Sequence, residues 1–331
     1  MSKFDVITIG SATRDVFLES GALTTLKSEH FSTGEGVCIP AGSKVEIDNI
    51  YLTTGGSAVN AAVTFANQGF NAALVSKTGN DSEGNTIKEQ LKKAGVETKH
   101  IIGSDEYKTA YSVIVHSTSG ERSIFVYRGA SAHFPKSEFN FNLLQSTKWI
   151  YVTHMGGDSS EIFEELVTTA HEKGVKIALN PGSTQLESGE SLIPLLDKVD
   201  ILFVNQEEAA HLTGEDYKDE HKVFEKLDSW VKGIAVMTKG SGGVAVSDGK
   251  TKWEAPALKE PVFKDRTGAG DAFGSGFTSV IMRGQSILEA IQAGSTNATG
   301  VVGEWGANNG ILKKNDSTDK FGKLEIKEIK I

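Results

Sequence analysis

Six short apolar runs, separated by segments with helical patterning, constrain the fold of this 331-residue chain most strongly. The run at 201–204 reads Ile-Leu-Phe-Val without alternation, so both of its faces should be buried, as in a parallel sheet covered by helices. The runs are 6–9, 73–76, 149–152, 177–180, 201–204 and 234–238. Together they predict an α/β fold, a Rossmann-like doubly wound αβα sandwich.

Helical patterning fills most of the intervals between these runs, and several of the helices end in glycine or asparagine. The predicted helices cover 58–67, 84–94, 160–173, 207–212, 223–231, 272–282 and 287–297. No Pro/Ser-rich or single-charge linker divides the chain, so we expect one domain over 1–331.

Two segments, approximately 12–54 and 107–130, depart from this pattern because apolar and polar residues alternate in them. They predict antiparallel strands, with a hairpin turn at 117–121. Both follow early strands of the sheet, so they can form a small β-sheet lid over the carboxyl ends of the strands. The second face of the lid is partly apolar, which predicts a homodimer through the lid with Ile47, Tyr51, Val113 and Val115 as candidate contacts.

Charge and cysteine content exclude several classes of protein. The net charge is -9 and the basic residues are scattered, so no nucleic acid partner is expected. No apolar stretch reaches membrane-spanning length, and the N-terminus reads as a strand instead of a signal peptide, so no membrane partner is expected. Cys38 is the only cysteine, so no intrachain disulfide can form and a cytoplasmic location is expected.

The segment 265–277 changes from turn-like to helix-like where Asp271 appears. Gly268 and Gly270 leave the backbone bare, so the amides of 268–271 can converge on a phosphate at the start of the helix. Asp271 then lies in the first helical turn, where it can accept a proton from a nearby hydroxyl. The alternative is a glycine-rich turn in which Asp271 only caps the helix.

A second glycine-rich segment, 54–60, joins a lid strand to the next helix. Gly55 and Gly56 let a small polar ligand approach the backbone, and Asn60 can donate to and accept from a sugar hydroxyl. Asp15, just beyond the first strand, could reach the same pocket. The alternatives are a strand-to-helix turn with Asn60 on a solvated face, and a turn role for Asp15.

Two further strand ends carry polar residues. Asn205 and Glu208 could hold hydrated Mg²⁺ or a phosphate through water, or could form an N-terminal capping box. The strand ending near Thr238 runs into a turn with Gly240 and Gly243, where backbone donors could contact a nucleotide; a plain hairpin is the alternative.

Taken in order, these motifs resemble those of the PfkB/ribokinase family of carbohydrate kinases over nearly the whole chain. The segments 55–60 and 265–271 are similar to the N-terminal Gly-Gly motif and the C-terminal D-T-x-G-A-G-D motif of the family, and 205–208 fits its N-x-x-E motif. The resemblance implies a ribokinase-like fold with a β-sheet lid. It also implies phosphorylation of a sugar or nucleoside hydroxyl that depends on ATP and Mg²⁺.

The resemblance also implies roles for individual residues. Asp271 corresponds to the catalytic base, and Gly268, Ala269 and Gly270 to the anion hole. Residues corresponding to substrate ligands are Asp15, Gly55, Gly56 and Asn60, whereas Asn205 and Glu208 belong to the Mg²⁺ and phosphate region. Nucleotide contacts fall on Thr238, Gly240, Gly243 and Asn297, and Asp265 and Thr267, near Gly306 and Gly310, resemble a monovalent-cation loop that would take K⁺.

Departures from the ribokinase pattern bear on the substrate. Ser57 and Thr13 stand where ribokinases usually have Lys and Asn, and no acidic residue follows the strand at 149–152. Arg14 and Arg128 could contact an acidic or phosphorylated substrate, although an exposed arginine on a β face is the commoner explanation. Stacking residues for a nucleoside kinase could be Phe17, Phe31 and Phe125, and a ligand-binding member without turnover is a further alternative.

Overall fold

A ten-stranded sheet forms the body of the protein in a computed structural model that describes residues 3–31, 34–116 and 122–331. The first strand, β1 (Phe4–Ile9), lies between two parallel neighbours, β6 (Ala72–Gly79) and β10 (Thr147–Val152). The sheet continues in parallel through β7 (Ile101–Ser104) on one side and through β11 (Lys176–Leu179), β12 (Ile201–Asn205) and β13 (Ile234–Thr238) on the other. An antiparallel edge follows, made of β14 (Val244–Ser247), β15 (Thr251–Ala255) and β16 (Lys327–Lys330).

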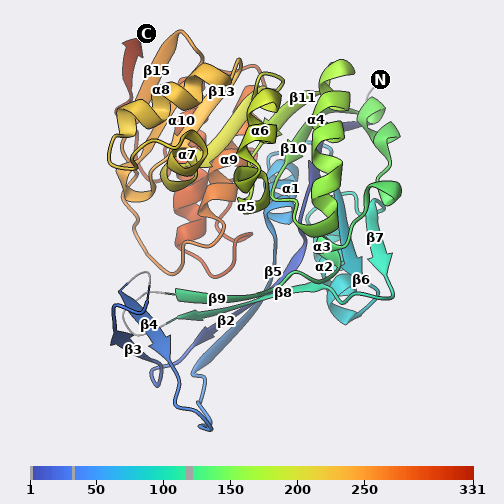
Figure 1. Ribbon diagram of the computed structural model, residues 1–331, viewed down its shortest axis with the longest axis vertical. Helices are drawn as coiled ribbons and strands as arrows, with labels where there is room; N and C mark the ends of the chain where they lie inside the picture. The colour runs from blue at the N-terminus through green and yellow to red at the C-terminus, as the bar shows by residue number, and fades with distance from the viewer. Residues whose placement is uncertain (1–2, 32–33, 117–121) are drawn as a thin grey trace.

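Helices cover both faces of this sheet (Figure 1). One face packs against α4 (Phe163–Glu172), α6 (Gly189–Leu196), α7 (Gln206–Thr213) and α8 (Glu220–Trp230). The other face packs against α1 (Ser57–Asn67), α9 (Ala269–Met282) and α10 (Ile287–Val302). The remaining helices are α2 (Ser82–Lys93), α3 (Gly129–Ala132), α5 (Ser183–Glu187) and the short 3-10 turns η1 (Lys136–Glu138), η2 (Phe141–Ser146), η3 (Gly157–Ile162) and η4 (Gly240–Gly242). The predicted doubly wound sandwich is therefore confirmed.

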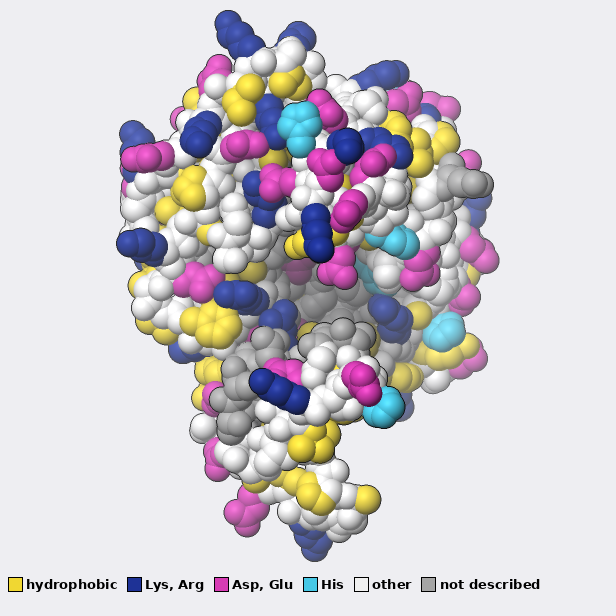
Figure 2. All heavy atoms as spheres, turned by 60° about the vertical axis from the view of Figure 1, so that its left-hand side comes forward, with side chains coloured by type: hydrophobic (Ala, Val, Ile, Leu, Met, Phe, Trp, Pro, Cys, Tyr) yellow, Lys and Arg dark blue, Asp and Glu magenta, His cyan; other side chains and the backbone are white. Residues whose placement is uncertain are grey.

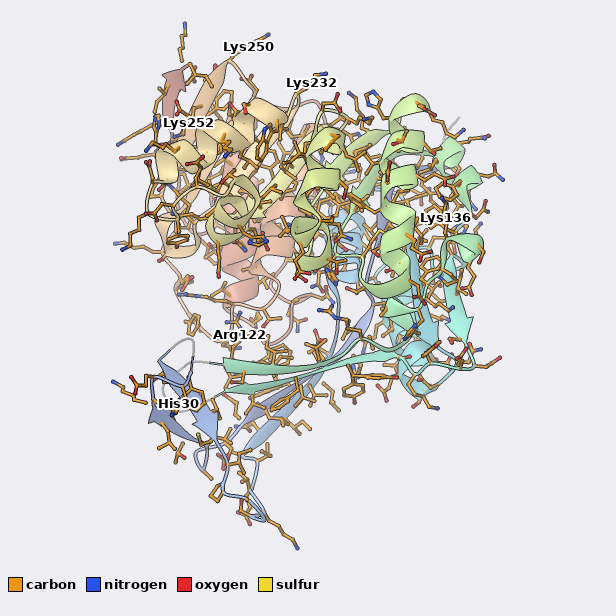
Figure 3. All side chains as sticks on the ribbon, in the orientation of Figure 1. His30, Arg122, Lys136, Lys232, Lys250 and Lys252 are labelled. Carbon is orange, nitrogen blue, oxygen red and sulfur yellow. The ribbon has the colours of Figure 1, made fainter. Side chains whose placement is uncertain are left out.

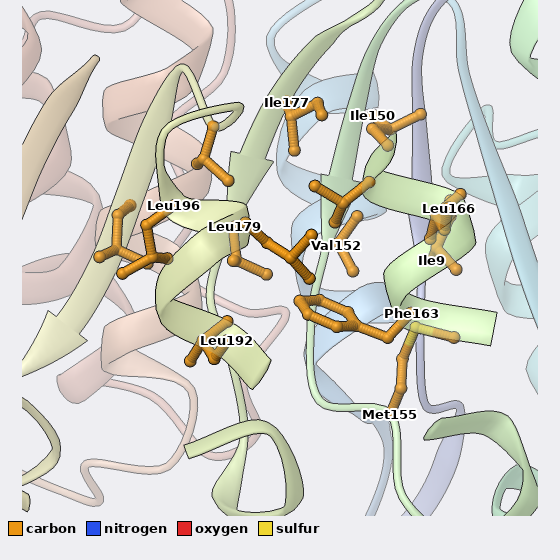
Figure 4. Packing of buried hydrophobic residues seen from close by; sticks show 14 of the residues in the cluster. Ile9, Ile150, Val152, Met155, Phe163, Leu166, Ile177, Leu179, Leu192 and Leu196 are labelled. Carbon is orange, nitrogen blue, oxygen red and sulfur yellow. The ribbon is translucent and has the colours of Figure 1, made fainter. Parts of the chain in front are cut away.

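Unbroken apolar strands lie in the middle of the core, as the sequence predicts. Ile150, Val152, Ile177 and Leu179 project from neighbouring strands toward the helices of one face, and Phe163 of α4 packs among them (Figure 4). All five side chains are buried, so this layer fixes where the carboxyl ends of the strands lie. None of the helices in the described ranges is both long and apolar enough to cross a bilayer.

The lid is a separate four-stranded sheet below the body in Figure 1, in the order β5 (Asn49–Gly55), β2 (Thr13–Glu19), β8 (Ala110–His116) and β9 (Arg122–Tyr127). The expectation of purely antiparallel strands is wrong, because the central pair β2 and β8 is parallel. Each of these strands follows a parallel strand of the body, so both leave the same edge in the same direction. The predicted turn at 117–121 lies outside the described residues.

Within the lid region, β3 (Thr24–Lys27) and β4 (Glu35–Cys38) form a hairpin of their own. The lid sheet has an outward face with Ile50, Leu52, Phe125 and Tyr127, all of which are exposed. Tyr51 is not on that face, contrary to prediction, since its ring stacks on Trp305 of the body at 4.8 Å. The outward face is nevertheless apolar, and the inward face lies over the carboxyl ends of the body strands.

Candidate active site

The start of α9 has the geometry that its glycines suggest. Gly268 adopts φ 80°, and a Cβ there would lie 2.2 Å from the Cβ of Ala307, so glycine is required for conformation and for space. The amide of Ala269 donates to the Arg266 carbonyl, whereas the amides of Gly270 and Asp271 have no acceptor among the described residues. Those two amides and the helix dipole therefore make an anion site.

Asp271 lies in the first turn of α9 and is held by residues of α1. The Asn60 Nδ2 donates to Asp271 Oδ2 at 2.8 Å, and the Ser57 hydroxyl donates to the same carboxyl group. Burial raises the pKa of Asp271, and these two hydrogen bonds oppose the rise. The Asn60 Oδ1 is buried without a partner among the described residues, so it is available to a hydroxyl donor in the cavity.

Asp15 projects from β2 of the lid into the same space. It is 4 % exposed, and burial raises its pKa to about 7, with the charge of Asp271 adding to the rise and a Ser112 hydrogen bond opposing it. A Cβ on Gly55 would lie 1.8 Å from Asp15 Oδ2, which explains the glycine at this position. Gly56 has φ 94°, so it too is needed where the lid strand turns into α1.

A cavity of about 340 Å³ brings most of the predicted substrate residues together between the lid and the body. Figure 2 shows the surface hollowed between these two parts. The predicted residues on its wall are Asp15, Gly56, Asn60, Arg128, Thr267, Gly268 and Asp271. Gly55 does not line the cavity but lies directly beside Asp15.

Sequence reasoning missed His154 in this cavity. Its Nε2 lies 2.9 Å from Nη1 of Arg128, and burial, with the Arg128 charge, lowers the His154 pKa to about 4. A neutral ring therefore accepts from the guanidinium and holds it over the cavity. The signal was available, because His154 lies two residues beyond the end of β10, and side chains at the carboxyl ends of strands reach the ligand site of such sheets.

The two arginines singled out in the sequence have different surroundings. Arg14 lies on the other face of the lid and forms an ion pair with Glu83 of α2 at 3.0 Å. It does not line the cavity, whereas Arg128 does. Only Arg128 is therefore placed to contact a substrate.

A second cavity, of about 160 Å³, lies on the other side of the α9 N-terminus. Thr238, Gly240 and Gly243 line it, as do Ala269 and Gly270 of the anion site. Its apolar walls are Val244, Ala257, Leu258, Phe273, Ala298 and Val302. An elongated ligand with an apolar end and an anionic end fits this cavity, and its anionic end meets the helix start.

Asn297 does not line either cavity. Its side chain is fully buried, donates to the Ala272 carbonyl at 2.7 Å and accepts from the Leu312 amide at 2.8 Å. Asn297 therefore ties α10 to α9 and to the segment around Leu312, while its neighbour Ala298 reaches the cavity wall.

Asn205 and Glu208 form the capping box of α7. Asn205 Oδ1 accepts from the Glu208 amide, and Glu208 Oε2 accepts from the Asn205 amide, each at 2.8 Å. Burial raises the Glu208 pKa, and the negative charges of Glu207 and Asp271 add to the rise. A cation near Glu208 and Asp271 would relieve this repulsion, so these residues fit hydrated Mg²⁺. No cluster of three or more His, Cys, Asp or Glu with metal-ligand geometry occurs in the part of the chain that is described.

Asp265 and Thr267, in the loop before α9, also fit a cation. Asp265 is 2 % exposed and its Oδ2 accepts from the Thr267 amide at 2.6 Å. Its Oδ1 and the Thr267 Oγ1 are buried and have no hydrogen-bond partner in the described residues. Two such oxygens, two residues apart in sequence, suit a monovalent cation.

Comparisons with known proteins show the family to which the chain belongs. The chain is 30% identical to the ribokinase of Haemophilus influenzae, in an alignment that covers 84% of this chain and 90% of that protein. It is 28% identical to the cytidine kinase of Thermococcus kodakarensis, in an alignment that covers 76% of this chain and 88% of that protein. Among solved structures, Arabidopsis thaliana ribokinase complexed with ribose and ATP aligns over 95% of this chain and 97% of that one, with a TM-score of 0.77 and 22% identity. The family model for pfkB family carbohydrate kinases matches residues 9–314, so this chain belongs to the pfkB family of carbohydrate kinases.

Proposed function

We propose that this protein transfers the terminal phosphoryl group of ATP, with Mg²⁺, to a hydroxyl of a small sugar or sugar derivative. One observation carries the proposal. The two cavities meet at the N-terminus of α9, with Gly268 and Asp271 on the wall of one and Ala269 and Gly270 on the wall of the other. An acceptor hydroxyl beside Asp271 would therefore face a phosphate held by the helix amides.

Asp271 is the proposed general base. Its carboxylate borders the cavity, and Asn60 and Ser57 hold it in one orientation, so it can accept the proton of a hydroxyl that attacks phosphorus. The amides of Gly270 and Asp271 stabilise the negative charge on the transferring group. The lid shields this space from water, which limits hydrolysis of ATP.

The nucleotide would occupy the second cavity, with Thr238, Gly240 and Gly243 beside its phosphates or ribose. Glu208 would hold Mg²⁺ through water, and the ion would neutralise charge on the phosphates. Asp265 and Thr267 would hold K⁺ or a similar monovalent ion. Asn297 supports this end of the site indirectly, through the helix pair α9 and α10.

A sugar fits the first cavity better than a nucleoside. Of the three candidate stacking residues, Phe17 is fully buried against Trp305 and His116, Phe125 lies on the outward face of the lid, and Phe31 lies beside the β3–β4 hairpin. None of the three lines the cavity. The cavity offers Asp15, Asn60 and Ser112 instead, which suit hydroxyl groups.

Arg128 supports an acceptor with an acidic or phosphate group. The other four arginines each have a carboxylate or carbonyl partner: Arg14 with Glu83, Arg122 with Asp265, Arg266 with Glu260 and Arg283 with Gln68. Among the described residues the polar partner of the Arg128 guanidinium is the neutral ring of His154, and no carboxylate pairs with it. Its guanidinium is therefore free to bind an anionic group of the acceptor.

We also propose that the protein is a homodimer through the outward face of the lid. Ile50, Leu52, Phe125 and Tyr127 expose between 50% and 64% of their surface there. A two-fold contact would cover both copies of this apolar face.

Assay of the purified protein with ATP and Mg²⁺ tests the function. The acceptors are neutral pentoses and hexoses, sugar acids, sugar phosphates and nucleosides, and Asp271→Asn is the inactive control. Transfer to a sugar derivative that disappears in the variant supports the proposal. Preference for a nucleoside, or equal turnover in the variant, contradicts it.

A further inference from the structure

A charged contact joins the lid to the loop that precedes α9. Arg122 of β9 places its Nε 3.7 Å from Asp265 Oδ1, and His116 of β8 places its Nε2 3.5 Å from the same oxygen. These two lid residues are paired across the strands β8 and β9. Figure 3 shows Arg122 at the part of the lid that faces the body. Burial lowers the pKa of His116, so Arg122 supplies the permanent positive charge of this contact.

Asp265 is connected to the anion site by a short path. Its other oxygen, Oδ2, accepts from the Thr267 amide, and Thr267 is followed by Gly268, the N-cap of α9. This hydrogen bond ties Asp265 to the turn that leads into the helix. Asp265 also adds its negative charge to the carboxylates that surround Asp15. A positive charge against Asp265 both holds this loop and offsets that repulsion.

Aromatic rings mark the same boundary between lid and body. Trp305 stacks on Tyr51 of the lid at 4.8 Å, and it also contacts His116 at 5.1 Å and Phe17 at 5.8 Å. The Arg122 contact therefore does not stand alone on an open surface but lies beside a packed junction.

We propose that Arg122 is a positioning residue of the kinase reaction, which links closure of the lid to the shape of the phosphate site through Asp265. With the lid closed over an acceptor, the guanidinium lies against Asp265 and fixes the turn that leads to Gly268. With the lid open, Asp265 loses this charge. Acceptor binding and the organisation of the anion site are then coupled. The inference rests on the proposed kinase function.

The same oxygen, Asp265 Oδ1, belongs to the pair of buried atoms that fits a monovalent cation. Arg122 and such a cation can therefore both serve as counter-charge for Asp265. It follows that removing Arg122 should make the protein depend more strongly on K⁺. This consequence can be measured without any turnover.

Kinetics of Arg122→Gln test the inference. We expect kcat/KM for the acceptor to fall about tenfold, because the buried Asp265 carboxylate loses the positive charge that lies against it. Arg122→Lys should recover most of this loss, because a positive charge remains. In an Asp265→Asn background, Arg122→Gln should have little further effect, since its partner is already neutral. Lys27→Gln is the matched control, because Lys27 also lies in the lid region and has no ion pair among the described residues.

Thermal melting gives the second readout. Each variant is melted in KCl and in tetramethylammonium chloride of equal ionic strength, without acceptor or nucleotide. We expect K⁺ to stabilise Arg122→Gln more than it stabilises the wild type or Lys27→Gln. Equal stabilisation by K⁺ in all three proteins would overturn the inference. Full additivity of the effects of Arg122→Gln and Asp265→Asn on kcat/KM would overturn it as well. If the wild type transfers no phosphate, the proposed function fails, and melting still tests the contact.

Discussion

Replacing Asp15 by asparagine should stabilise the protein at neutral and alkaline pH, although it removes a proposed substrate ligand. Burial raises the Asp15 pKa from 3.8 to about 7 in the folded protein. In the unfolded chain the carboxyl group ionises at its ordinary pKa. Between these two values the folded state binds more protons than the unfolded state, so stability falls as the pH rises through this window.

The pKa difference sets the size of the effect. A difference of about 3 units corresponds to ~4 kcal/mol of stability that the wild type lacks above pH 7. About 2 of those units lie between pH 5 and pH 7, so roughly 3 kcal/mol should be lost in that interval. Asparagine keeps the shape of the side chain and does not titrate. The gain from Asp15→Asn should therefore grow by about this amount from pH 5 to pH 7 and become constant about one pH unit higher, where Asp15 is fully ionised in the folded protein.

Urea unfolding at pH 5, 6, 7 and 8, without nucleotide or acceptor, measures this gain. Asp319→Asn is the control, because Asp319 is exposed and its carboxylate has no hydrogen bond or ion pair among the described residues. Its unfolding free energy should follow that of the wild type at every pH. A gain for Asp15→Asn that does not change between pH 5 and pH 8 would refute the reasoning, because it would mean that Asp15 ionises normally in the folded protein.

Three further predictions concern turnover, substrate binding and assembly. Asp271→Asn should lower kcat by roughly 10²- to 10⁴-fold with little change in ADP affinity by calorimetry; retained turnover would exclude Asp271 as the base. Gly55→Ala should displace the Asp15 carboxylate, whose oxygen lies 1.8 Å from the added Cβ, and raise the acceptor KM roughly tenfold or more, with the KM for ATP unchanged. A rise confined to ATP would reverse the assignment of the two cavities. Phe125→Glu, on a side chain 64% exposed, should yield monomers in light scattering, whereas an unchanged mass would place any interface elsewhere.

Features encoded within a few neighbouring residues could be predicted well. The apolar run 201–204 is a buried strand, and the capping box of Asn205 and Glu208 forms as its spacing suggests. Gly268 adopts the left-handed conformation at the start of α9. Helix α6 was not predicted, because Pro194 lies inside it and proline disfavours the interior of a helix. Packing of Leu192 and Leu196 in the core stabilises the helix in spite of this proline.

Contacts between distant parts of the chain could not be predicted. The parallel pairing of β2 and β8 depends on how two separate strands leave the body sheet. Arg14, on β2, pairs with Glu83, whereas Arg128, at the start of α3, meets His154. Asn297 forms hydrogen bonds with the backbone of Ala272 and Leu312, and sequence patterns do not reveal such contacts.

The sequence by itself determined the alternation of strands and helices and the glycines and carboxylate of the phosphate site, because these follow from local geometry and from burial patterns within single elements. The tertiary structure alone decided which side chains share a cavity. Asn60 and Asp271 are 211 residues apart in the chain, yet their side chains form a hydrogen bond of 2.8 Å. His154 follows β10 of the body and Arg128 follows β9 of the lid, so these two side chains meet only in the folded protein. Such distances are set by how the sheet, its helices and the lid pack together, and packing depends on the whole chain at once.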